Sequence, residues 1–428
     1  MVLASEQIMR PTTGEYAHTA HWRSQAHMPT AIESTIKIVS GEGPYVIDSE
    51  GNRLLDGTAA LFLCNVGHAQ PKLVEAARAQ MEKLEFYHNH GHFVGEPAER
   101  LASRVRDLSP LSDAKIFFTS GGSDSIETAC KLARLHWQLE GRYDKKYILF
   151  RDRAYHGLHA FGTSLAGLQF NREGYGVESL IPETLRVPWD DIDEVERLME
   201  ELGAENIAAF ITEPIIGSGG ILAPPDGYFA KLNKLARKHE FLIIVDEIST
   251  GFGRTGDYWG TDRFGIDADM ITMAKGITSG YLPLGGVQVA RRVWDRFFSG
   301  PDAPVFRHGL TYAGHNTACA VAEANIDLID EMGLVERVKT LGKALDAGVH
   351  SLAGGTGVIE VRAGHGLLAA VKFDPEINLE PVVLAARKKG VLVRALSGNE
   401  IAVSPPFVLE DQHIDEIVDA IAFGIAGL

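Results

Sequence analysis

The sequence Phe241-Leu242-Ile243-Ile244-Val245-Asp246-Glu247 joins a short apolar run to two acidic residues. The run is rich in β-branched side chains, which predicts a strand buried on both faces. A second short apolar run, Met270–Met273, leads into Ala274-Lys275-Gly276. A carboxylate and a lysine therefore each follow a predicted strand. Because ligands of open α/β sheets bind outside the carboxyl ends of the strands, we expect Asp246 and Lys275 to share one crevice.

Strand and helix patterns alternate on both sides of this stretch. Short apolar runs predict further strands at residues 115–119, 147–150 and 207–212. Apolar residues at helical spacing predict helices at residues 123–137, 192–202 and 229–236. This alternation predicts an α/β fold, with a mainly parallel sheet and helices on both of its faces.

After about residue 320 the pattern changes to longer helices and shorter strands, which predicts a smaller α+β domain at residues 321–428. Residues 66–320 are then the large, ligand-binding domain. Residues 1–65 are expected to contain an N-terminal arm and strands that join the small domain. The arm, residues 1–35, carries Pro11 and Pro29 among polar side chains and is expected to be irregular.

The composition limits the range of partners and compartments. The chain has 428 residues, of which 45% are hydrophobic, and its net charge is −16. An acidic surface repels phosphate backbones and anionic lipids, so neither nucleic acid nor a membrane is an expected partner. The three cysteines are widely spaced, which argues against a disulfide framework and fits a reducing compartment. With no signal-peptide core and no apolar run long enough to span a bilayer, a cytoplasmic protein is expected.

Three histidines alternate in the segment His88-Asn89-His90-Gly91-His92. On a strand they would share one face, as the ligands of a metal ion do. Gly91 weakens the strand interpretation, and no cysteine lies nearby in the sequence. A polar loop is therefore the favoured interpretation, and we expect no metal site.

Five predicted strands are followed by residues that could bind a ligand or take part in catalysis, namely Gly121-Gly122-Ser123, Tyr155, Glu213, Asp246 and Lys275. Gly121 and Gly122 lack side chains and precede a predicted helix. Backbone N–H groups and the helix dipole at such a position favour an anion such as phosphate.

Other motifs near these strand ends are weaker. Asp124 and Glu127 have the spacing of a capping box for the predicted helix. Gly251–Gly256 matches the dinucleotide pattern Gly-x-Gly-x-x-Gly, but no helix pattern follows it. The chain has no Walker A loop and no Gly-x-Ser-x-Gly motif of serine hydrolases.

A phosphate site, an aromatic ring, a carboxylate and a lysine together suit pyridoxal 5′-phosphate (PLP). This cofactor needs its phosphate held, its ring stacked, its ring nitrogen paired with a carboxylate and its aldehyde captured by a lysine. Asp246 can pair with the nitrogen, Lys275 can capture the aldehyde, and Tyr155 can stack on one face of the ring.

These motifs resemble those of the class III (ω-) aminotransferases, in the family's order and spacing over roughly residues 20–425. The matching segments are Thr119–Ser125, Tyr155-His156-Gly157, Thr212-Glu213-Pro214, Asp246–Gly256, Ala274-Lys275-Gly276 and His308–His315. The resemblance implies a PLP-dependent enzyme of fold-type I. It also implies a homodimer or a dimer of dimers, with active sites at the subunit interface.

The resemblance implies a role for each matching residue around the cofactor ring. Lys275 corresponds to the family's Schiff-base lysine and Asp246 to the partner of the ring nitrogen. Tyr155 and Ile248 correspond to the residues on the two ring faces, and Glu213 to an acidic residue near the ring.

The phosphate contacts are implied in the same way. Gly121, Gly122 and Ser123 would hold the phosphate, together with Thr311 of the partner subunit. The family more often has serine at the position of Gly121. One hydroxyl contact is therefore absent here, whereas the backbone N–H contacts remain.

The C-terminal segment Val391–Ala395, followed by Ser404-Pro405-Pro406, resembles the amine:pyruvate and ω-amino acid:pyruvate branch. Arg394 corresponds to a mobile arginine that binds the keto-acid carboxylate, and Phe62 to an aromatic residue of the large substrate pocket. From the residues alone, a surface arginine and a core phenylalanine remain the alternative interpretations.

Relatives that act on ornithine or γ-aminobutyrate use a glutamate to lock this arginine, five residues after the Glu-Pro glutamate. Ser218 occupies that position here. Without the lock Arg394 is expected to move freely, which favours pyruvate.

The predicted function is PLP-dependent transfer of an amino group from an amine or ω-amino acid to an α-keto acid, expected to be pyruvate. Lys275 would move the proton of the donor carbon in a ping-pong cycle. Three alternatives stay open: an aminomutase or decarboxylase on the same scaffold, a nicotinamide oxidoreductase, and a catalytically inactive binding protein.

Overall fold

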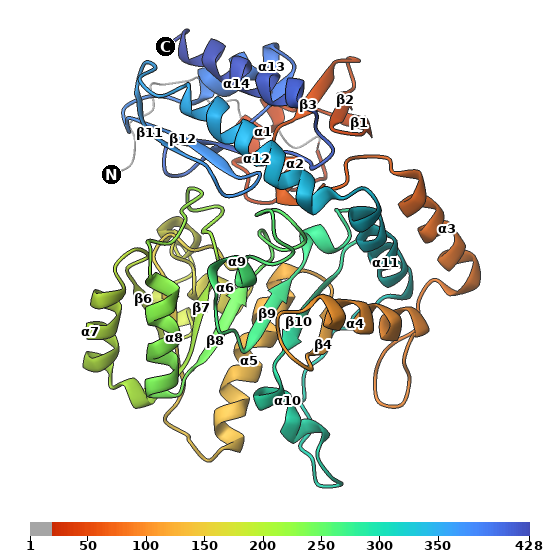
Figure 1. Cartoon of the computed structure of the whole chain (residues 1–428), viewed down its shortest axis with the longest axis vertical. Coiled ribbons are helices and arrows are strands. Elements are labelled where there is room, and N and C mark those ends of the chain that lie inside the picture. Colours follow the sequence, from red (N-terminus) through yellow and green to blue (C-terminus); the bar gives the residue numbers. More distant parts are fainter. Residues whose placement is uncertain (1–18) are drawn as a thin grey trace.

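The largest of three sheets forms the centre of the molecule. The computed structural model describes residues 19–428 (Figure 1). The sheet has the strand order β4-β10-β9-β8-β7-β5-β6. Its strands are β4 (Lys115–Thr119), β5 (Tyr147–Arg151), β6 (Thr184–Val187), β7 (Ile207–Thr212), β8 (Leu242–Asp246), β9 (Met270–Met273) and β10 (Gly285–Val289). All neighbours are parallel except β10, which runs antiparallel to both β9 and β4. This is the mainly parallel sheet predicted from the sequence.

Strand β8 shows why the sheet needs a layer of helices on each face. All of its residues are buried. Leu242 and Ile244 belong to the apolar cluster that includes helix α5 (Gly122–Leu139). Ile243 and Val245 belong to the other cluster, with helix α8 (Tyr228–His239). Because successive side chains of a strand point to opposite faces, an uninterrupted apolar run must be covered on both sides.

The helices that cover the two faces of the sheet follow the predicted pattern, with one correction. Helix α7 (Ile192–Leu202) lies beside α8 and ends at Gly203, which has a φ of +82°. Helix α5 begins at Gly122, with Gly121 as an N-cap that makes no side-chain cap. The predicted capping box is wrong, because this early start places Asp124 within the first turn. Glu127 instead accepts a hydrogen bond from the Phe161 N–H.

Two four-stranded sheets lie above the large sheet in Figure 1. The first, in the order β1-β2-β3-β13, consists of β1 (Ile38–Glu42), β2 (Tyr45–Asp48), β3 (Arg53–Asp56) and β13 (Val391–Leu392). The second, in the order β11-β12-β15-β14, consists of β11 (Val358–Arg362), β12 (Ala369–Phe373), β14 (Arg394–Leu396) and β15 (Glu400–Val403). Pairing of β13 with β3 joins the early strands to the C-terminal part of the chain.

Six further helices within residues 19–428 pack against the small sheets or against one another. Three of them are α12 (Leu334–His350), α13 (Glu380–Lys388) and α14 (Asp411–Ile425). Helix α11 (Asn316–Glu331) packs against α3 (Pro71–Leu84), α4 (Glu96–Leu108) and α12. The predicted domain boundary at 320/321 falls within α11, and the division into domains stays a prediction.

The predicted arm contains one element that the sequence reading missed. Met28–Glu33 form the short helix α1, with Pro29 in its first turn. Proline is tolerated there because its missing N–H would have no partner within the helix. The prediction of an irregular arm is therefore wrong for residues 28–33. Residues 1–18 of the arm lie outside the part of the chain that the structure describes.

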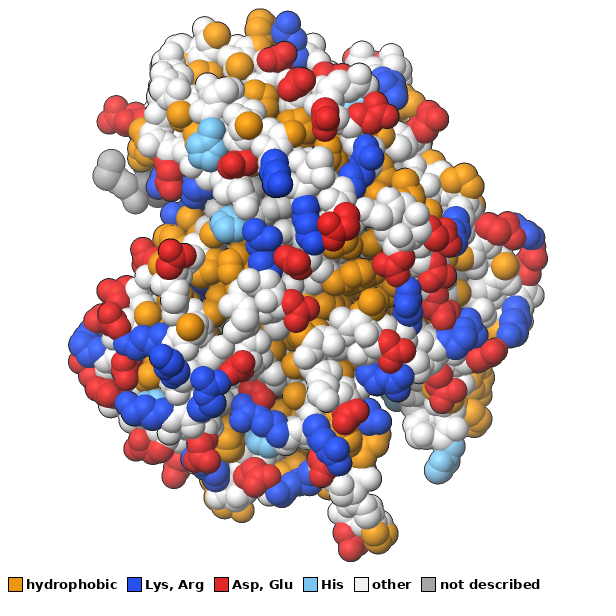
Figure 2. Space-filling model, viewed as in Figure 1, with side chains coloured by type: hydrophobic (Ala, Val, Ile, Leu, Met, Phe, Trp, Pro, Cys, Tyr) orange, Lys and Arg blue, Asp and Glu red, His pale blue; other side chains and the backbone are white. Residues whose placement is uncertain are grey.

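Figure 2 shows acidic and basic side chains interspersed over one face of the molecule. No helix within residues 19–428 is both long and apolar enough to cross a membrane. The three alternating histidines lie in a loop between α3 and α4, as predicted. The described residues contain no group of three or more side chains suited to hold a metal ion.

Candidate active site

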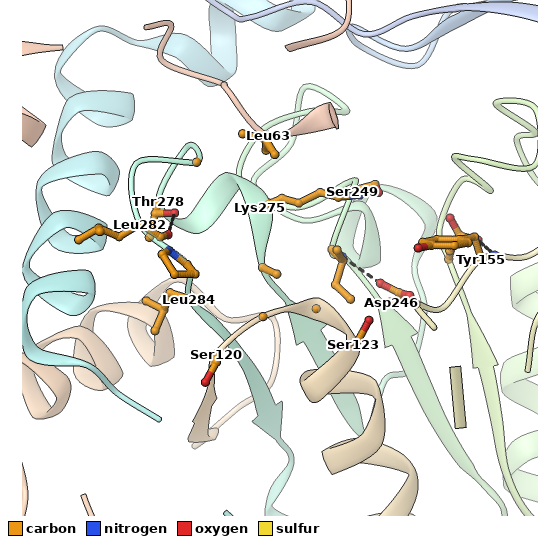
Figure 3. Close-up of a pocket in the computed structure, with 18 residues that line it drawn as sticks. Leu63, Ser120, Ser123, Tyr155, Asp246, Ser249, Lys275, Thr278, Leu282 and Leu284 are labelled. Carbon is orange, nitrogen blue, oxygen red and sulfur yellow. Dashed lines mark hydrogen bonds between the residues drawn. The ribbon is translucent and has the colours of Figure 1, made fainter. Parts of the chain in front are cut away.

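The carboxyl ends of the parallel strands open onto a cavity of about 440 Å³ (Figure 3). Most of the predicted site residues line it, namely Gly121, Gly122, Ser123, Tyr155, Glu213, Asp246, Ile248 and Lys275. They come from five strand ends and meet because parallel strands end at the same edge of a sheet. The cavity thus brings an amine, two carboxylates, a phenol and a helix N-terminus together.

Lys275 follows β9 in a strained conformation, with a φ of +48°. Its Nζ donates a hydrogen bond to Ser249 Oγ at 2.6 Å and lies 5.3 Å from the ring centroid of Phe62. Burial lowers the pKa of Lys275 to about 8, while the nearby Asp246 and Glu213 act in the opposite direction. A lysine with a lowered pKa has a larger neutral fraction, and the neutral amine is the form that acts as nucleophile or base.

Asp246, the last residue of β8, is held by two hydrogen bonds. Its Oδ2 lies 2.8 Å from His156 Nδ1, and its Oδ1 accepts the Ile248 N–H at 3.0 Å. Both side chains of the Asp246–His156 pair are buried. An ionised carboxylate has only acceptors, so Nδ1 of His156 is the donor in this pair.

Glu247 follows Asp246 but serves the interior rather than the cavity. It is fully buried, and its carboxylate accepts hydrogen bonds from Thr250 Oγ1 and from the N–H and hydroxyl of Thr261. Burial raises the pKa of Glu247. Of the two acids that close the strand, only the first therefore lines the cavity.

Glu213 ties the Tyr155 loop to the loop that follows β7. Its Oε1 accepts the Tyr155 N–H at 3.1 Å, and its Oε2 accepts the Gly217 N–H at 2.8 Å. Burial raises the pKa of Glu213, and it also raises the pKa of Tyr155. The position of the Tyr155 backbone is thus set by a buried acid from the neighbouring strand.

The start of α5 is tightly enclosed by the neighbouring loops. A Cβ added to Gly157, which has a φ of +81°, would lie 2.3 Å from Ser123 Oγ. A Cβ on Gly122 would lie 3.0 Å from Ile248 Cδ1. Glycine at these positions lets the Tyr155 loop and Ile248 approach the helix N-terminus closely.

These groups fit PLP. The N-terminus of α5 can accept its phosphate, and Asp246 can pair with the ring nitrogen. Tyr155 and Ile248 present an aromatic and an aliphatic side chain to the cavity, and Lys275 presents its amine. Elsewhere the cavity wall includes the apolar side chains of Leu63, Leu282 and Leu284, together with Thr278 (Figure 3).

Three predicted site residues do not line this cavity. Phe62 is buried among apolar side chains, with its ring near the Lys275 amine. Thr311 is exposed, in a turn that precedes α11. Arg394 is half-buried on β14, where burial lowers its pKa and its charge acts on Tyr155 and Lys275.

Sequence reasoning assigned no role to His156 or Ser249. His156 stood in a quoted motif, and Ser249 followed the predicted ring-contacting residue Ile248. No local signal distinguishes either from an ordinary polar residue, because each role depends on a partner from another strand. The same holds for the three leucines of the cavity wall.

Comparisons with known proteins agree over almost the whole chain. Residues 27–424 match the family model described as aminotransferase class-III. The ω-amino acid–pyruvate aminotransferase of Pseudomonas putida is 32% identical, with 94% of each chain covered. The putrescine–pyruvate aminotransferase of Pseudomonas aeruginosa is 34% identical, covering 89% of this chain and 91% of that protein.

Solved structures show the same similarity in three dimensions. An amine transaminase from an uncultivated Pseudomonas species, in its PLP-bound form, superposes with a TM-score of 0.92 at 31% identity. The match covers 96% of this chain and 100% of that one. An (S)-enantioselective ω-transaminase from Thermomicrobium roseum gives a TM-score of 0.90 at 36% identity, with 96% and 97% covered.

Proposed function

Because the chain belongs to the class III aminotransferases, we propose that it transfers an amino group from an amine or ω-amino acid to pyruvate. The observation that carries the proposal is the single cavity in which Lys275, Asp246, Tyr155 and the start of α5 converge. Relatives named for ω-amino acids and for putrescine both use pyruvate, which supports this acceptor. Enzymes of this family depend on PLP, which when bound draws electrons from the donor carbon and so acidifies its proton.

The proposed cofactor contacts follow from the side chains that line the cavity. The backbone N–H groups of Gly121, Gly122 and Ser123 bind the phosphate at the start of α5. Asp246, held by His156, pairs with the ring nitrogen. Tyr155 and Ile248 enclose the ring, and Glu213 holds the Tyr155 backbone in place.

Lys275 is the proposed proton carrier. Its amine, whose pKa burial lowers to about 8, would take the proton from the donor carbon and deliver it to the bound cofactor within the same half of the ping-pong cycle, and would carry a proton in the reverse direction, to the keto-acid carbon, in the second half. Ser249 Oγ, at 2.6 Å from Nζ, orients this amine within the cavity.

The proposed substrates match the two halves of the site. An apolar group on the donor lies against Leu63, Leu282 and Leu284. Arg394 binds the pyruvate carboxylate, and Ser218 places no carboxylate where related enzymes lock this arginine. Phe62 lies outside the cavity lining, with its ring centroid 5.3 Å from Lys275 Nζ, and acts on the site through that amine.

Assays of a panel of amine donors with pyruvate and with 2-oxoglutarate test which keto acid is the acceptor. Pyruvate should give the higher kcat/KM, and Ser218→Glu should raise the KM for pyruvate by restraining Arg394. Equal use of both acceptors, or preference for 2-oxoglutarate, would contradict the proposed acceptor.

A half-reaction distinguishes the aminotransferase from an aminomutase or decarboxylase. Without acceptor, the enzyme should convert to the pyridoxamine form and release one carbonyl product per site. Lys275→Ala should show no turnover. Release of carbon dioxide, or an amino group that stays on the donor, would instead support the alternative.

The proposed assembly is a homodimer or a dimer of dimers, with the active sites shared between subunits. Large apolar side chains that a second copy could cover are exposed on two loops, namely Tyr87, Phe93 and Val94 on one and Val305 and Tyr312 on the other. Thr311, beside Tyr312, would bind the phosphate in the neighbouring subunit. The three cysteines are free and buried, which supports a cytoplasmic location.

Mixed subunits test this sharing. Thr311→Ala should weaken PLP binding, and Lys275→Ala should be inactive. In a hybrid of the two variants, one site combines the intact Lys275 of one subunit with the intact Thr311 of the other. At a PLP concentration too low to load Thr311→Ala, activity should therefore rise on mixing, and no rise in verified hybrids would contradict phosphate binding across the interface.

A further inference from the structure

Arg153 and Glu400 form an ion pair between the Tyr155 loop and the small sheet that carries Arg394. Glu400 begins β15 and is fully buried. Its Oε1 accepts a hydrogen bond from Arg153 Nη2 at 3.1 Å and another from Arg362 Nη2 at 2.6 Å. A buried carboxylate with charged partners holds those partners firmly, because losing one leaves charge without compensation.

On the side of the large sheet, the ion pair belongs to the Tyr155 loop itself. Arg153 stands two residues before Tyr155 and has a φ of +65°. Its Nε also donates to the Gly219 carbonyl at 2.8 Å. The guanidinium therefore joins the same two loops that Glu213 joins through the N–H groups of Tyr155 and Gly217.

On the small-sheet side, the pair acts on the strand that begins with Arg394. Strand β14 pairs with β15, and Leu396 lies opposite Glu400 in this pairing. Arg394 lies opposite Ala402 on the same ladder. Holding Glu400 thus holds the backbone from which Arg394 projects.

Glycines make room for the contact. A Cβ on Gly220 would lie 2.4 Å from Glu400 Oε2, and one on Gly398 would lie 2.5 Å from Arg153 Nη2. A Cβ on Gly219 would lie 2.0 Å from the Arg153 carbonyl oxygen. The backbone approaches the ion pair from both sides as closely as glycine allows, so the pair has little freedom to shift.

We infer that Arg153 and Glu400 are positioning residues that set the distance between Tyr155 and Arg394. They line neither the cofactor nor the substrate part of the cavity and act only through these two neighbours. This inference rests on the proposed function, in which Tyr155 contacts the cofactor ring and Arg394 binds the keto acid. Loosening the pair should therefore disturb two binding events that have no atom in common.

The test uses the holoenzyme carrying Glu400→Gln. The dissociation constant of PLP and the KM for pyruvate should both rise about tenfold or more, because small displacements of positioning groups have effects of this size. The visible circular dichroism of bound PLP should change, since it reports the ring environment. The KM for an apolar aldehyde acceptor, which offers Arg394 no carboxylate, should change less than that for pyruvate.

Arg362→Gln is the matched control. It removes the other arginine from the same carboxylate but leaves the Tyr155 loop attached. It should lower the unfolding temperature while the PLP dissociation constant and the pyruvate KM stay near wild type. If Glu400→Gln fails to fold, Arg153→Lys is the substitute variant. It keeps the positive charge, but lysine cannot donate to Glu400 and to the Gly219 carbonyl in the geometry of the guanidinium. The PLP dissociation constant and the KM for pyruvate should again both rise.

The inference is overturned if the folded variant is less stable yet binds PLP and pyruvate like wild type, or if Arg362→Gln reproduces both binding defects. Failure of the proposed function is a separate result. Wild-type enzyme would then not use pyruvate, whereas PLP affinity and circular dichroism would still report whether the pair positions Tyr155.

Discussion

Lys275 is a buried amine whose protonation state should control how fast the apoenzyme captures PLP. Burial lowers its pKa from 10.5 to about 8, so below pH 8 most of it is charged and unreactive. The capture rate should rise about tenfold per pH unit up to that pH and then level off. Stopped-flow absorbance of apoenzyme mixed with PLP measures this profile. A rate still rising up to pH 10.5 would contradict the lowered pKa.

The same shift has a consequence for stability, with a definite sign. Between about pH 8 and 10.5 the unfolded chain keeps a proton on Lys275 that the folded apoenzyme has lost. Stability of the apoenzyme therefore gains from this residue as the pH rises through that window, and the penalty is fully present below it. Lys275→Met should remove this contribution, which denaturation at several pH values can measure.

His156 should affect catalysis through Asp246 alone. Its Nδ1 donates to Asp246 Oδ2, and hydrogen bonds to charged groups contribute about 1.5–3 kcal/mol. His156→Leu should therefore lower kcat roughly tenfold to a hundredfold. His156→Asn places an amide N–H near the position of Nδ1 and should retain more activity. Equal losses in the two variants, measured by steady-state kinetics, would show that the ring's volume matters rather than its donor.

At the scale of elements, the close approach of the Tyr155 loop to α5 depends on Gly157. This residue has a φ of +81°, and a Cβ would meet Ser123 Oγ at 2.3 Å. Gly157→Ala should therefore displace the start of α5 and weaken PLP binding about tenfold or more. Equilibrium titration of apoenzyme with PLP measures the change.

Gly141 is the matched control for this substitution. Its φ is +73°, but a Cβ there would meet no atom within 4 Å. Gly141→Ala should cost some stability through backbone strain and leave PLP affinity unchanged. If both variants bind PLP equally well, the contact between the loop and the helix has no role in the site.

At the scale of the whole molecule, Arg254, in the loop after β8, contacts segments from the N-terminal and C-terminal parts of the chain. It is fully buried, donates to Asn65 Oδ1 at 2.8 Å and to the Pro405 carbonyl, and lies over the Phe407 ring. Arg254→Lys should lower the free energy of unfolding by about 3 kcal/mol, because lysine cannot reproduce this planar set of donors. Arg237→Lys, at an exposed ion pair with Asp267, should change it by less than about 1 kcal/mol. Denaturant unfolding of the apoenzyme measures both, and similar losses would contradict the linking role.

The comparisons confirm the predicted family, fold class and PLP dependence. Chain length and net charge do not determine the number of subunits. The resemblance was reliable because its motifs extend over almost the whole chain in a constant order. Roles of individual residues and the acceptor stay proposals that the experiments above address, and the domain boundaries stay a prediction.

Local patterns were sufficient for the alternation of strands and helices, the buried strand β8 and the residues at five strand ends. Strand burial, glycine before a helix and a polar residue after an apolar run are all properties of neighbours in sequence. The convergence of those strand ends followed from the rule that the carboxyl ends of parallel strands lie at one edge of a sheet.

The tertiary structure decided which side chains from different elements meet in and around the site. It paired His156 with Asp246, brought Ser249 to Lys275 and placed Glu400 against Arg153. It also put the Phe62 ring near the Lys275 amine but outside the cavity lining. Each of these contacts joins residues from different elements, and no periodicity within one segment reports which distant side chain will meet it.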